Sequence, residues 1–533
     1  MSEASKKHLW WQKGVVYQIY PRSFMDSNAD GIGDLPGITT KLEYVAHLGV
    51  DAVWLSPIFS SPMADFGYDV SDYTGIHPMF GTLEDFDAFV EKAHGLGLKV
   101  ILDYVPNHTS DEHPWFVESR SSKVNPKRDW YVWRDAKPDG SVPNNWLSEF
   151  GGPAWSWDEK TGQYYYRAYH EKQPDLNWRN PEVREAMVDV LRFWMDRGVD
   201  GFRVDAVNHL AEDESFRDDP PNPDWDGKDS RHVYHRQIPI HTSNLPETHE
   251  AVADMRRTLD SHGGAERLLI GEVYLSGEEL MAYYGVANDG FHMPTNMELV
   301  RAAWDARKIS AYIEAYEAAL PEGAWPNWVV GNHDNPRIAS RVGKGQARVA
   351  AMLLLTLRGT PTIYYGDEIG MTDGDVPPEL ERDPVAKSVP GFGRDPERTP
   401  MQWNATEKNA GFSDSEPWLP VPEGDFATVE AQRGDSYSML ALHRKLLALR
   451  RAEDALSVGS YSPSEVRDDL LSYIRGHDGR RLLVALNFGE KDVDLDVPFR
   501  GRISLSTHLD REGEEVSDSV SLRPNEGVVV EES

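Results

Sequence analysis

Short apolar runs alternate along the chain with longer stretches in which apolar residues recur every three to four positions. The runs Val15–Tyr20, Ala52–Leu55 and Val100–Val105 are typical of β-strands. Amphipathic stretches near Ile38–Leu48 and Leu83–Leu96 separate them and are predicted helices. A β-α-β-α-β order calls for a parallel sheet with helical crossovers.

The alternation stops after the third strand. Residues 106–172 are rich in Pro, Gly, Trp, Tyr and Asn and contain no long helical period. A structureless loop of that length is uncommon in a compact domain. We therefore predict a small inserted subdomain that leaves the end of the third strand.

The strand and helix rhythm resumes after this insertion. A helix is predicted over Pro181–Asp196, with the proline in the first turn, where a missing N–H costs least. Five more strands follow, and an apolar helix that includes Ala347–Leu357 separates the last two: Gly201–Asp205, Leu268–Val273, Phe291–Pro294, Trp328–Gly331 and Pro361–Tyr365. Eight parallel strands with alternating helices predict a (β/α)8 TIM barrel.

The pattern changes again after a predicted helix at Tyr437–Arg451. Short apolar runs separated by turn residues are typical of an antiparallel β-domain, here Leu471–Ile474, Leu482–Asn487, Val493–Val497 and Val528–Val530. We predict a barrel built from residues 1–105 and 173–457, an inserted subdomain over 106–172, and a C-terminal β-sandwich over 458–533.

Composition narrows the possible partners. The 533 residues carry a formal charge of −33 and no cysteine. The charge disfavours nucleic acid and anionic membranes, and the lack of cysteine excludes disulfides and thiolate metal sites. The acidic surface is explained either by solubility or by adaptation to high salt. No apolar run is long enough to span a bilayer, and the segment Met1–His8 lacks the apolar core of a signal peptide, so a cytoplasmic monomer or homodimer is expected.

Three predicted strands end in or near carboxylates. Asp205, Glu272 and Asp334 lie in the segments Gly201–Asp205, Gly271–Val273 and Asn332–Asp334, and Asp103–His108 adds a fourth polar strand end. Polar residues at the carboxyl ends of barrel strands usually serve function. Converging carboxylates suggest glycoside hydrolysis, which needs one carboxylate to attack the anomeric carbon and one acid to protonate the leaving oxygen. The alternative, that each acid caps a helix or pairs with an arginine, would require four ordered segments to coincide by chance.

The residues around these acids indicate the charge state that each acid needs. Arg203 is two residues before Asp205, so both side chains point to the same side of the strand. A guanidinium there favours an ionised Asp205, as a nucleophile requires. Glu272 must begin protonated, so we expect burial and Asp205 to raise its pKa. A retaining mechanism needs the two carboxyls about 5–5.5 Å apart.

Three longer motifs are more specific than these acids. They are Trp10–Arg22, Gln173–Trp178 and Arg398–Trp403. With them, nearly the whole chain resembles glycoside hydrolase family 13, the α-amylase superfamily, and its α-glucosidase and oligo-1,6-glucosidase branch in particular. The resemblance implies that Asp205 is the nucleophile, Glu272 the general acid/base, and Asp334 a stabiliser of the distorted sugar.

The same resemblance implies a set of sugar-binding residues. His108 and His333 would donate hydrogen bonds to the sugar, and Tyr68 would stack on the non-reducing glucose. Asp65, with Arg398, would hold the far hydroxyls of that glucose and close the pocket, which makes the enzyme exo-acting. The alternative for this loop is a simple turn with a buried tyrosine.

Two of these assignments stay open. Arg394 and Arg398 both lie near the predicted clamp, and we favour Arg398. Phe150, in the segment Ser148–Gly152, resembles an aromatic residue near the cleavage point, but it is also compatible with the core of the insertion.

The segment Asp26–Asp34 resembles the structural Ca²⁺ or Mg²⁺ loop of this branch. Oxygen-bearing side chains alternate along it, and Gly31 allows a sharp turn. It is not an EF-hand, because Gly37 replaces the expected glutamate. The expected ligands are Asp26, Asn28, Asp30, the carbonyl of Ile32, and Asp34. An Asx-rich turn without metal is the alternative, and no organic cofactor is implied.

The residue after the nucleophile bears on the linkage. In this branch valine accompanies α-1,6 substrates and alanine or threonine α-1,4 substrates, so Ala206 favours α-1,4. The segment Asp213–His235 departs from the pattern of α-1,6 enzymes. We therefore expect a retaining, exo-acting α-glucosidase acting on short oligosaccharides, with transglucosylation as a side activity. An oligo-1,6-glucosidase, a sucrose isomerase or a trehalose synthase remain alternatives, whereas a non-catalytic transporter subunit would lack the carboxylates.

Overall fold

The computed structural model describes residues 8–227, 230–264, 266–388, 393–421 and 427–533. Its largest sheet has eight strands in the order β11-β10-β9-β5-β2-β1-β13-β12, and neighbouring strands within it pair in parallel. The strands are β1 (Val16–Ile19), β2 (Ala52–Leu55), β5 (Lys99–Tyr104), β9 (Gly201–Val204), β10 (Leu268–Gly271), β11 (Met293–Pro294), β12 (Asn327–Val329) and β13 (Thr360–Tyr364). The eight predicted barrel strands are confirmed.

One side chain links the two terminal strands of this sheet. Asn327, the first residue of β12, accepts a hydrogen bond from the backbone N–H of Asn296 at 3.1 Å and donates one to the carbonyl of Pro294 in β11. An amide side chain that bonds to backbone in this way substitutes for strand pairing. The seam of the barrel is closed by Asn327 where β11 is only two residues long.

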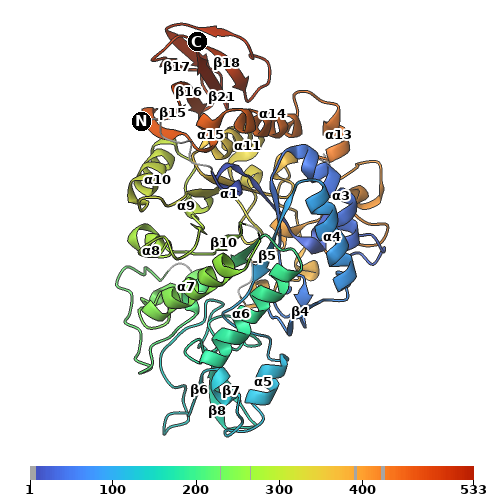
Figure 1. Cartoon of the computed structure of the whole chain (residues 1–533), viewed down its shortest axis with the longest axis vertical. Coiled ribbons are helices and arrows are strands. Elements are labelled where there is room, and N and C mark those ends of the chain that lie inside the picture. The colour runs from blue at the N-terminus through green and yellow to red at the C-terminus, as the bar shows by residue number, and fades with distance from the viewer. Residues whose placement is uncertain (1–7, 228–229, 265, 389–392, 422–426) are drawn as a thin grey trace.

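Helices follow the strands and cover the outside of the barrel (Figure 1). Their starts have local causes: Thr82 and Asp85 form a capping box for α4, and Asn180 caps α6, whose first residue is Pro181. The helices are α1 (Trp10–Lys13), α2 (Pro21–Phe24), α3 (Leu35–Leu48), α4 (Leu83–Gly95), α5 (Pro114–Ser119), α6 (Pro181–Asp196), α7 (Pro246–Ser261), α8 (Gly277–Ala282), α9 (Glu298–Arg301), α10 (Ala306–Ala319), α11 (Ile338–Thr356), α12 (Pro384–Ser388), α13 (Val429–Arg433), α14 (Met439–Ala452) and α15 (Asp454–Ser457).

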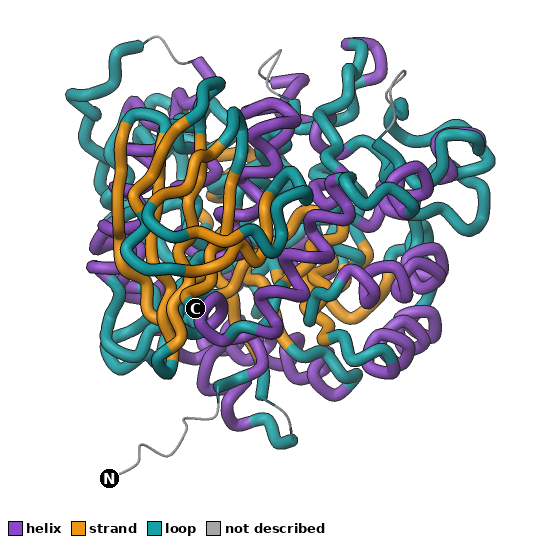
Figure 2. Tube along the Cα trace, turned by 90° about the horizontal axis from the view of Figure 1, so that it is seen from above, coloured by secondary structure: helices purple, strands orange, loops and turns teal. Residues whose placement is uncertain are grey.

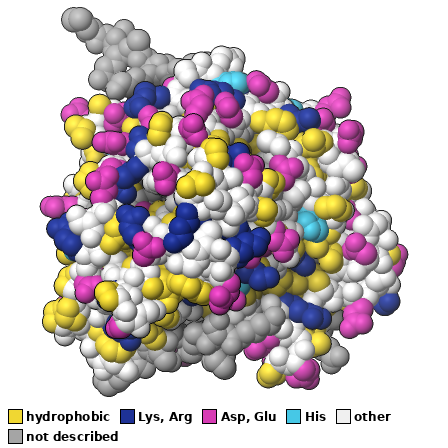
Figure 3. Space-filling model, turned by 90° about the horizontal axis from the view of Figure 1, so that it is seen from below, with side chains coloured by type: hydrophobic (Ala, Val, Ile, Leu, Met, Phe, Trp, Pro, Cys, Tyr) yellow, Lys and Arg dark blue, Asp and Glu magenta, His cyan; other side chains and the backbone are white. Residues whose placement is uncertain are grey.

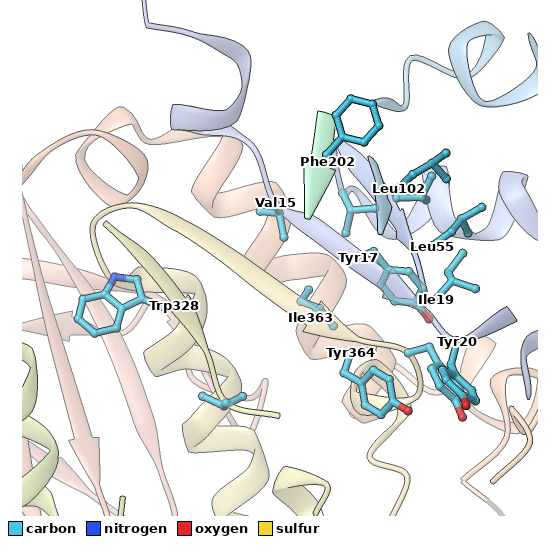
Figure 4. Packing of buried hydrophobic residues seen from close by; sticks show 14 of the residues in the cluster. Val15, Tyr17, Ile19, Tyr20, Leu55, Leu102, Phe202, Trp328, Ile363 and Tyr364 are labelled. Carbon is cyan, nitrogen blue, oxygen red and sulfur yellow. The ribbon is translucent and has the colours of Figure 1, made fainter. Parts of the chain in front are cut away.

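Alternate strand residues build two separate apolar layers. Tyr17, Ile19 and Phe202 belong to the large cluster between strands and helices, part of which Figure 4 shows. Val16 and Leu268 belong to a smaller cluster inside the barrel. Successive side chains of a strand point to opposite faces, so every second residue points into the barrel. The apolar interior residues therefore determine which residues nearer the carboxyl ends also point inward. Those positions carry the polar residues described below.

The insertion lies between β5 and α6. It contains α5 and a three-stranded antiparallel sheet in the order β6-β8-β7, formed by β6 (Trp133–Arg134), β7 (Trp155–Asp158) and β8 (Gln163–Tyr166). A second short hairpin, β3 (Phe59–Ser60) with β4 (Asp72–Ile76), follows the second barrel strand. In Figure 1 the insertion lies at the end of the molecule opposite to the C-terminal strands.

The C-terminal region is antiparallel, as predicted. One sheet runs β14-β15-β16-β21-β18-β19 and a second pairs β17 with β20, with an apolar cluster of their own. Figure 2 shows these strands grouped beside the helices of the barrel. The strands are β14 (Ser460–Arg467), β15 (Leu470–His477), β16 (Arg480–Asn487), β17 (Val493–Asp496), β18 (Gly501–Ser506), β19 (Glu515–Val516), β20 (Ser519–Leu522) and β21 (Gly527–Glu532).

Buried arginines bond backbone carbonyls close to the junction between this region and the barrel. Arg450 of α14 donates to the carbonyls of Leu355 and Leu357 at the end of α11, both at 3.0 Å. Arg475 of β15 donates to Leu456 at 2.8 Å and to Gly459 at 2.9 Å. These bonds satisfy carbonyls that helix ends leave unpaired. The C-terminal sheet is therefore tied to the barrel by charge-assisted bonds as well as by apolar contact.

Charged side chains of both signs lie on the surface. Figure 3 shows acidic side chains spread among basic and apolar ones on the face it displays. In the described ranges, no helix combines the length and apolar character needed to cross a membrane. Most of the N-terminal segment Met1–His8, used above to argue against a signal peptide, lies outside the described residues.

Candidate active site

Polar side chains occupy the carboxyl ends of the barrel strands. Trp54 and Ile101 fill the barrel interior, and the inward positions two residues further along are polar. On β5 this is Asp103, and on β9 Arg203 is followed two residues later by Asp205. All three are buried. The alternation of the strands thus collects charged groups at one mouth of the barrel.

Arg203 lies at the centre of this group. Its Nη1 contacts Asp103 Oδ1 at 2.8 Å and Asp205 Oδ1 at 2.7 Å, and its Nη2 contacts Glu272. Three buried carboxylates therefore share one guanidinium. Charges removed from water in this way require such pairing, because unpaired burial is strongly unfavourable.

Asp205 and Glu272 lie side by side. Val204 of β9 pairs with Gly271 of β10, so the two acids are the next residues on neighbouring strands. The N–H of Ala206 donates to Glu272 Oε2 at 3.3 Å. Burial, the charge of Glu272 and a hydrogen bond with Glu272 raise the pKa of Asp205 well above its usual value, against the opposing effect of Arg203. The carboxyls of Asp205 and Glu272 therefore interact with each other as well as with Arg203.

Asp334 differs from that pair in its charge state. It follows β12, and Arg394 and Arg398 contact its Oδ1 at 3.1 and 2.7 Å. Burial would raise the pKa of Asp334, but His333 and the two arginines hold it below its usual range. Burial also lowers the pKa of His333 to about 3, so His333 is neutral and the arginines keep Asp334 ionised.

Tyr68 and His333 line the mouth between Asp103 and Asp334. Tyr68 Oη lies 2.6 Å from His333 Nε2 and donates to Asp103 Oδ2 at 3.1 Å. Gln18 Nε2 lies 2.8 Å from His333 Nδ1. The predicted sugar-binding residues Tyr68 and His333 are thus in direct contact, and Gln18, which the sequence analysis did not name, orients the imidazole.

Asp65 is paired with Arg394, not with Arg398. Arg394 Nη2 donates to Asp65 Oδ1 at 2.9 Å and contacts Asp383, and Nη1 of the same guanidinium contacts Asp334. Arg398 is buried and donates to the carbonyl of His333 at 2.7 Å. The tight turn Pro396–Arg398 places Arg398 beneath the mouth, in contact with Asp334. Which of the two arginines contacts the sugar stays a prediction.

His108 lies behind the same clamp. Its Nε2 is 3.2 Å from the carbonyl of Tyr68 and 3.1 Å from Gln173 Nε2, and Gln173 also donates to Asp65 at 3.2 Å. Burial lowers the pKa of His108 to about 3, so its imidazole is neutral. Neutral imidazole and amide groups can exchange hydrogen bonds with sugar hydroxyls without a change of charge.

The insertion contributes aromatic residues to the mouth. Phe150 is half-buried, its ring centroid lies 5.7 Å from that of Tyr169, and the guanidinium of Arg394 lies 5.7 Å from it. Tyr169 also contacts His108 and His209, both at 5.5 Å between centroids. Phe150 therefore lies at the rim and not in the core of the insertion. The sequence analysis missed Tyr169, although it stands four residues before the motif that begins at Gln173.

The loop proposed to hold a metal offers oxygen donors only, which fits Ca²⁺ or Mg²⁺. Asp26 accepts hydrogen bonds from the N–H of Gly31 at 2.8 Å and from Ser413 at 2.6 Å, and Asp30 accepts from the N–H of Ile32 at 2.8 Å. Asp34 caps α3 by accepting from Gly37. Nowhere in the described ranges do three or more His, Cys, Asp or Glu side chains form a metal-binding group.

Comparisons with known proteins agree with this arrangement. The family model "Alpha amylase, catalytic domain" matches residues 18–459. A probable alpha-glucosidase of Rhizobium meliloti is 43% identical, with 94% of this chain and 93% of the relative covered. An oligo-1,6-glucosidase of Halalkalibacterium halodurans is 38% identical, with 98% of each covered.

Solved structures are similar over the same length. The α-glucosyl transfer enzyme XgtA has a TM-score of 0.92 at 40% identity, with 99% of this chain and all of that chain covered. The trehalulose synthase MutB from Pseudomonas mesoacidophila MX-45 has a TM-score of 0.89 at 33% identity, with 98% and 100% covered. An enzyme named for glucosyl transfer and one named a trehalulose synthase thus share this architecture.

Proposed function

The chain belongs to the α-amylase family, glycoside hydrolase family 13, and is a glycoside hydrolase; from this premise we propose that it is a retaining, exo-acting α-glucosidase. It removes glucose from the non-reducing end of short α-glucosides and prefers the α-1,4 linkage. The observation that carries the proposal is the contact of Asp205 and Glu272 with one guanidinium, on neighbouring strands. Two carboxyls at such close range support a double displacement.

In the first step, Asp205 attacks the anomeric carbon while Glu272 donates its proton to the glycosidic oxygen, and the shortened sugar leaves. In the second step, Glu272 takes a proton from water, the water oxygen attacks the anomeric carbon, and the bond to Asp205 breaks. Arg203 stabilises Asp205 as a carboxylate when it leaves.

The exo-action follows from the far side of the pocket. Asp65 is buried and pairs with the partly buried Arg394, and both can bond the hydroxyls of a terminal glucose. A longer chain would have to displace this pair. Asp334 and His333 would bond the hydroxyls nearer the reacting carbon, where the ring flattens in the transition state.

The α-1,4 preference rests on Ala206. This residue is buried and adopts a left-handed conformation with φ of 51°. A β-branched residue is strained in that conformation, and its methyl groups would narrow the acceptor side of the pocket. Pocket shape of this kind changes selectivity by about 1–3 kcal/mol.

Initial rates on maltose, isomaltose, sucrose and maltotriose test the proposal. We expect kcat/KM for maltose to exceed that for isomaltose by about tenfold or more. Glucose should be the first product from maltotriose, and glucosyl transfer should increase at high sugar concentration. A preference for isomaltose would make the protein an oligo-1,6-glucosidase. Conversion of sucrose into an isomer without net release of glucose would make it an isomerase.

We also propose that Asp26, Asn28, Asp30, Ile32 and Asp34 hold a structural Ca²⁺ or Mg²⁺, which would join the loop to the start of α3. Saturating ion should stabilise the fold by about 2–3 kcal/mol at a hundred times its dissociation constant. The melting temperature of chelator-treated enzyme should therefore rise when either ion is added back.

A pair of variants tests the metal proposal. Asp30→Ala should remove the rise in melting temperature. Asp139→Ala, which changes an exposed aspartate in a turn of the insertion, should retain it. Equal melting temperatures of the unmodified enzyme in chelator and in either ion would exclude a structural metal in this loop.

A further inference from the structure

A tight turn of the insertion presents two side chains to the mouth. Its backbone is closed by bonds from the N–H of Ser148 to the carbonyl of Gly152 at 3.0 Å and from Gly151 to Ser148 at 2.9 Å. Gly151 and Gly152 have φ values of 89° and 76°, which favour glycine. Glu149 and Phe150 occupy the tip, between these fixed ends.

The two tip residues face different parts of the pocket. Phe150 lies against Arg394, the arginine of the glucose clamp. Glu149 lies against His209, which is four residues after Asp205 and belongs to the loop that leaves the end of β9. The tip therefore connects the wall that holds the terminal glucose with the wall where the leaving sugar must lie.

Within the part of the chain that the structure describes, one oxygen of the Glu149 carboxylate has a hydrogen-bond partner. Its Oε1 is 3.2 Å from His209 Nε2, and His209 Nδ1 is 2.8 Å from the carbonyl of Thr242. His209 is buried, whereas 30% of the Glu149 side chain is exposed. Among the described residues, nothing bonds the second oxygen, Oε2. A fixed carboxylate with one unused oxygen is an acceptor for an incoming hydroxyl.

Tyr169 locates this carboxylate relative to the catalytic pair. Burial raises the pKa of the Tyr169 phenol, and the charges of Glu149, Asp205 and Glu272 raise it further. The Tyr169 ring contacts Phe150 at the tip, His209 after Asp205 and His108 of the glucose pocket, with centroid distances of 5.7, 5.5 and 5.5 Å. Glu149 bonds His209, so it borders the same pocket as Tyr169 and the loop that follows Asp205.

We propose that Glu149 is a specificity residue for the leaving sugar: its Oε2 accepts a hydrogen bond from a hydroxyl of that sugar, and in glucosyl transfer from a hydroxyl of the acceptor. The inference rests on the proposed function. It selects neutral, hydroxyl-rich groups, because Glu149 and the nearby acids repel anionic ones. Leaving groups without hydroxyls gain nothing from it.

Two substrates with the same glucose but different leaving groups test this role. Maltose has a leaving sugar with hydroxyls, and p-nitrophenyl α-glucoside does not. Glu149→Ala should lower kcat/KM for maltose by about tenfold, the effect of losing one hydrogen bond to a charged acceptor. The value for the nitrophenyl glucoside should stay within about twofold, since it makes no such bond.

Matched variants sharpen the test. Glu149→Gln keeps an oxygen acceptor and should lie between wild type and Glu149→Ala on maltose. Glu159→Ala, at an exposed position in the turn between β7 and β8, should match wild type on both substrates. Equal losses on both substrates would mean that Glu149 only supports the turn, and no loss on either would mean that it makes no contact; both results overturn the inference. A wild-type enzyme inactive on both substrates would instead refute the proposed function.

Discussion

Replacing Asp205 with alanine is expected to reduce kcat on p-nitrophenyl α-glucoside by on the order of 10⁴-fold or more. Without this carboxylate no group remains to bond the anomeric carbon. The neighbouring acids cannot replace it, because Glu272 must protonate the leaving oxygen and Asp334 is tied to two arginines. Steady-state rates of purified variant and wild type, compared at saturating substrate, measure the effect.

The fold should tolerate this change. Because the pKa of Asp205 is raised in the folded protein, the folded state loses stability as pH rises from the unfolded pKa through the folded one. The alanine variant has no carboxyl to ionise at this position and does not lose this stability. Its melting temperature near neutral pH should therefore equal or exceed that of wild type.

Asp200 provides a matched control at the other end of the same strand. It is paired with His94 at 2.7 Å and Lys99 at 2.8 Å, and although burial raises its pKa, these bonds lower it below the usual value. Asp200→Asn should lower the melting temperature and leave kcat within about twofold, since surface and base contacts of a barrel serve stability. Retention of substantial activity by Asp205→Ala, or an equal loss in Asp200→Asn, would contradict the assignment.

The second large effect is expected at Arg203. Arg203→Met leaves Asp103, Asp205 and Glu272 buried without their shared cation. Breaking a buried ion pair from one side typically costs about 3–5 kcal/mol. The carboxyls would then take up protons, which removes the ionised nucleophile. We expect both a large loss of kcat and a clear decrease in the denaturant midpoint.

Arg197 is a control of the same residue type. It forms a partly exposed pair with Asp87 at 2.7 Å, and such pairs contribute about 0–1 kcal/mol. Arg197→Met should therefore retain nearly all stability and activity. If Arg203→Met were as stable and as active as Arg197→Met, the guanidinium would not be the group that organises the acids.

The barrel could be predicted because each strand carries its own signal. The run Ala52–Leu55 and the helix Pro181–Asp196 coincide with β2 and α6, whose apolar residues and N-terminal signals are local. The helices Pro246–Ser261 and Ala306–Ala319 were not identified, since they lie among loops with no boundary as clear as Pro181. In the C-terminal region, β14 is half-exposed and includes Pro463, so its pattern was too weak to be recognised.

The site, like the fold, contains residues that could be located from the sequence and residues that could not. Asp205, Glu272 and Asp334 could be located near the mouth from the sequence because a residue at a strand end inherits its position from the strand. The partner of Asp65 could not be predicted, because Arg394 and Arg398 stand four residues apart in an irregular segment where sequence gives no direction for either side chain. Tyr169 and Glu149 reach the mouth from the insertion, through contacts that only the three-dimensional packing supplies. Roles of individual residues stay predictions until variants are measured.

The central claim is that Asp205 bonds the anomeric carbon while Glu272, which follows the adjacent strand, transfers the proton. Mass spectrometry of peptides from enzyme incubated with 5-fluoro-α-glucosyl fluoride tests it most directly, because the fluorine slows release of the covalent intermediate. The account predicts one fluoroglucosyl group on the peptide that contains Asp205, attached to that side chain. A label on any other carboxylate, or an active enzyme that releases the inverted anomer and acquires no label, would contradict it.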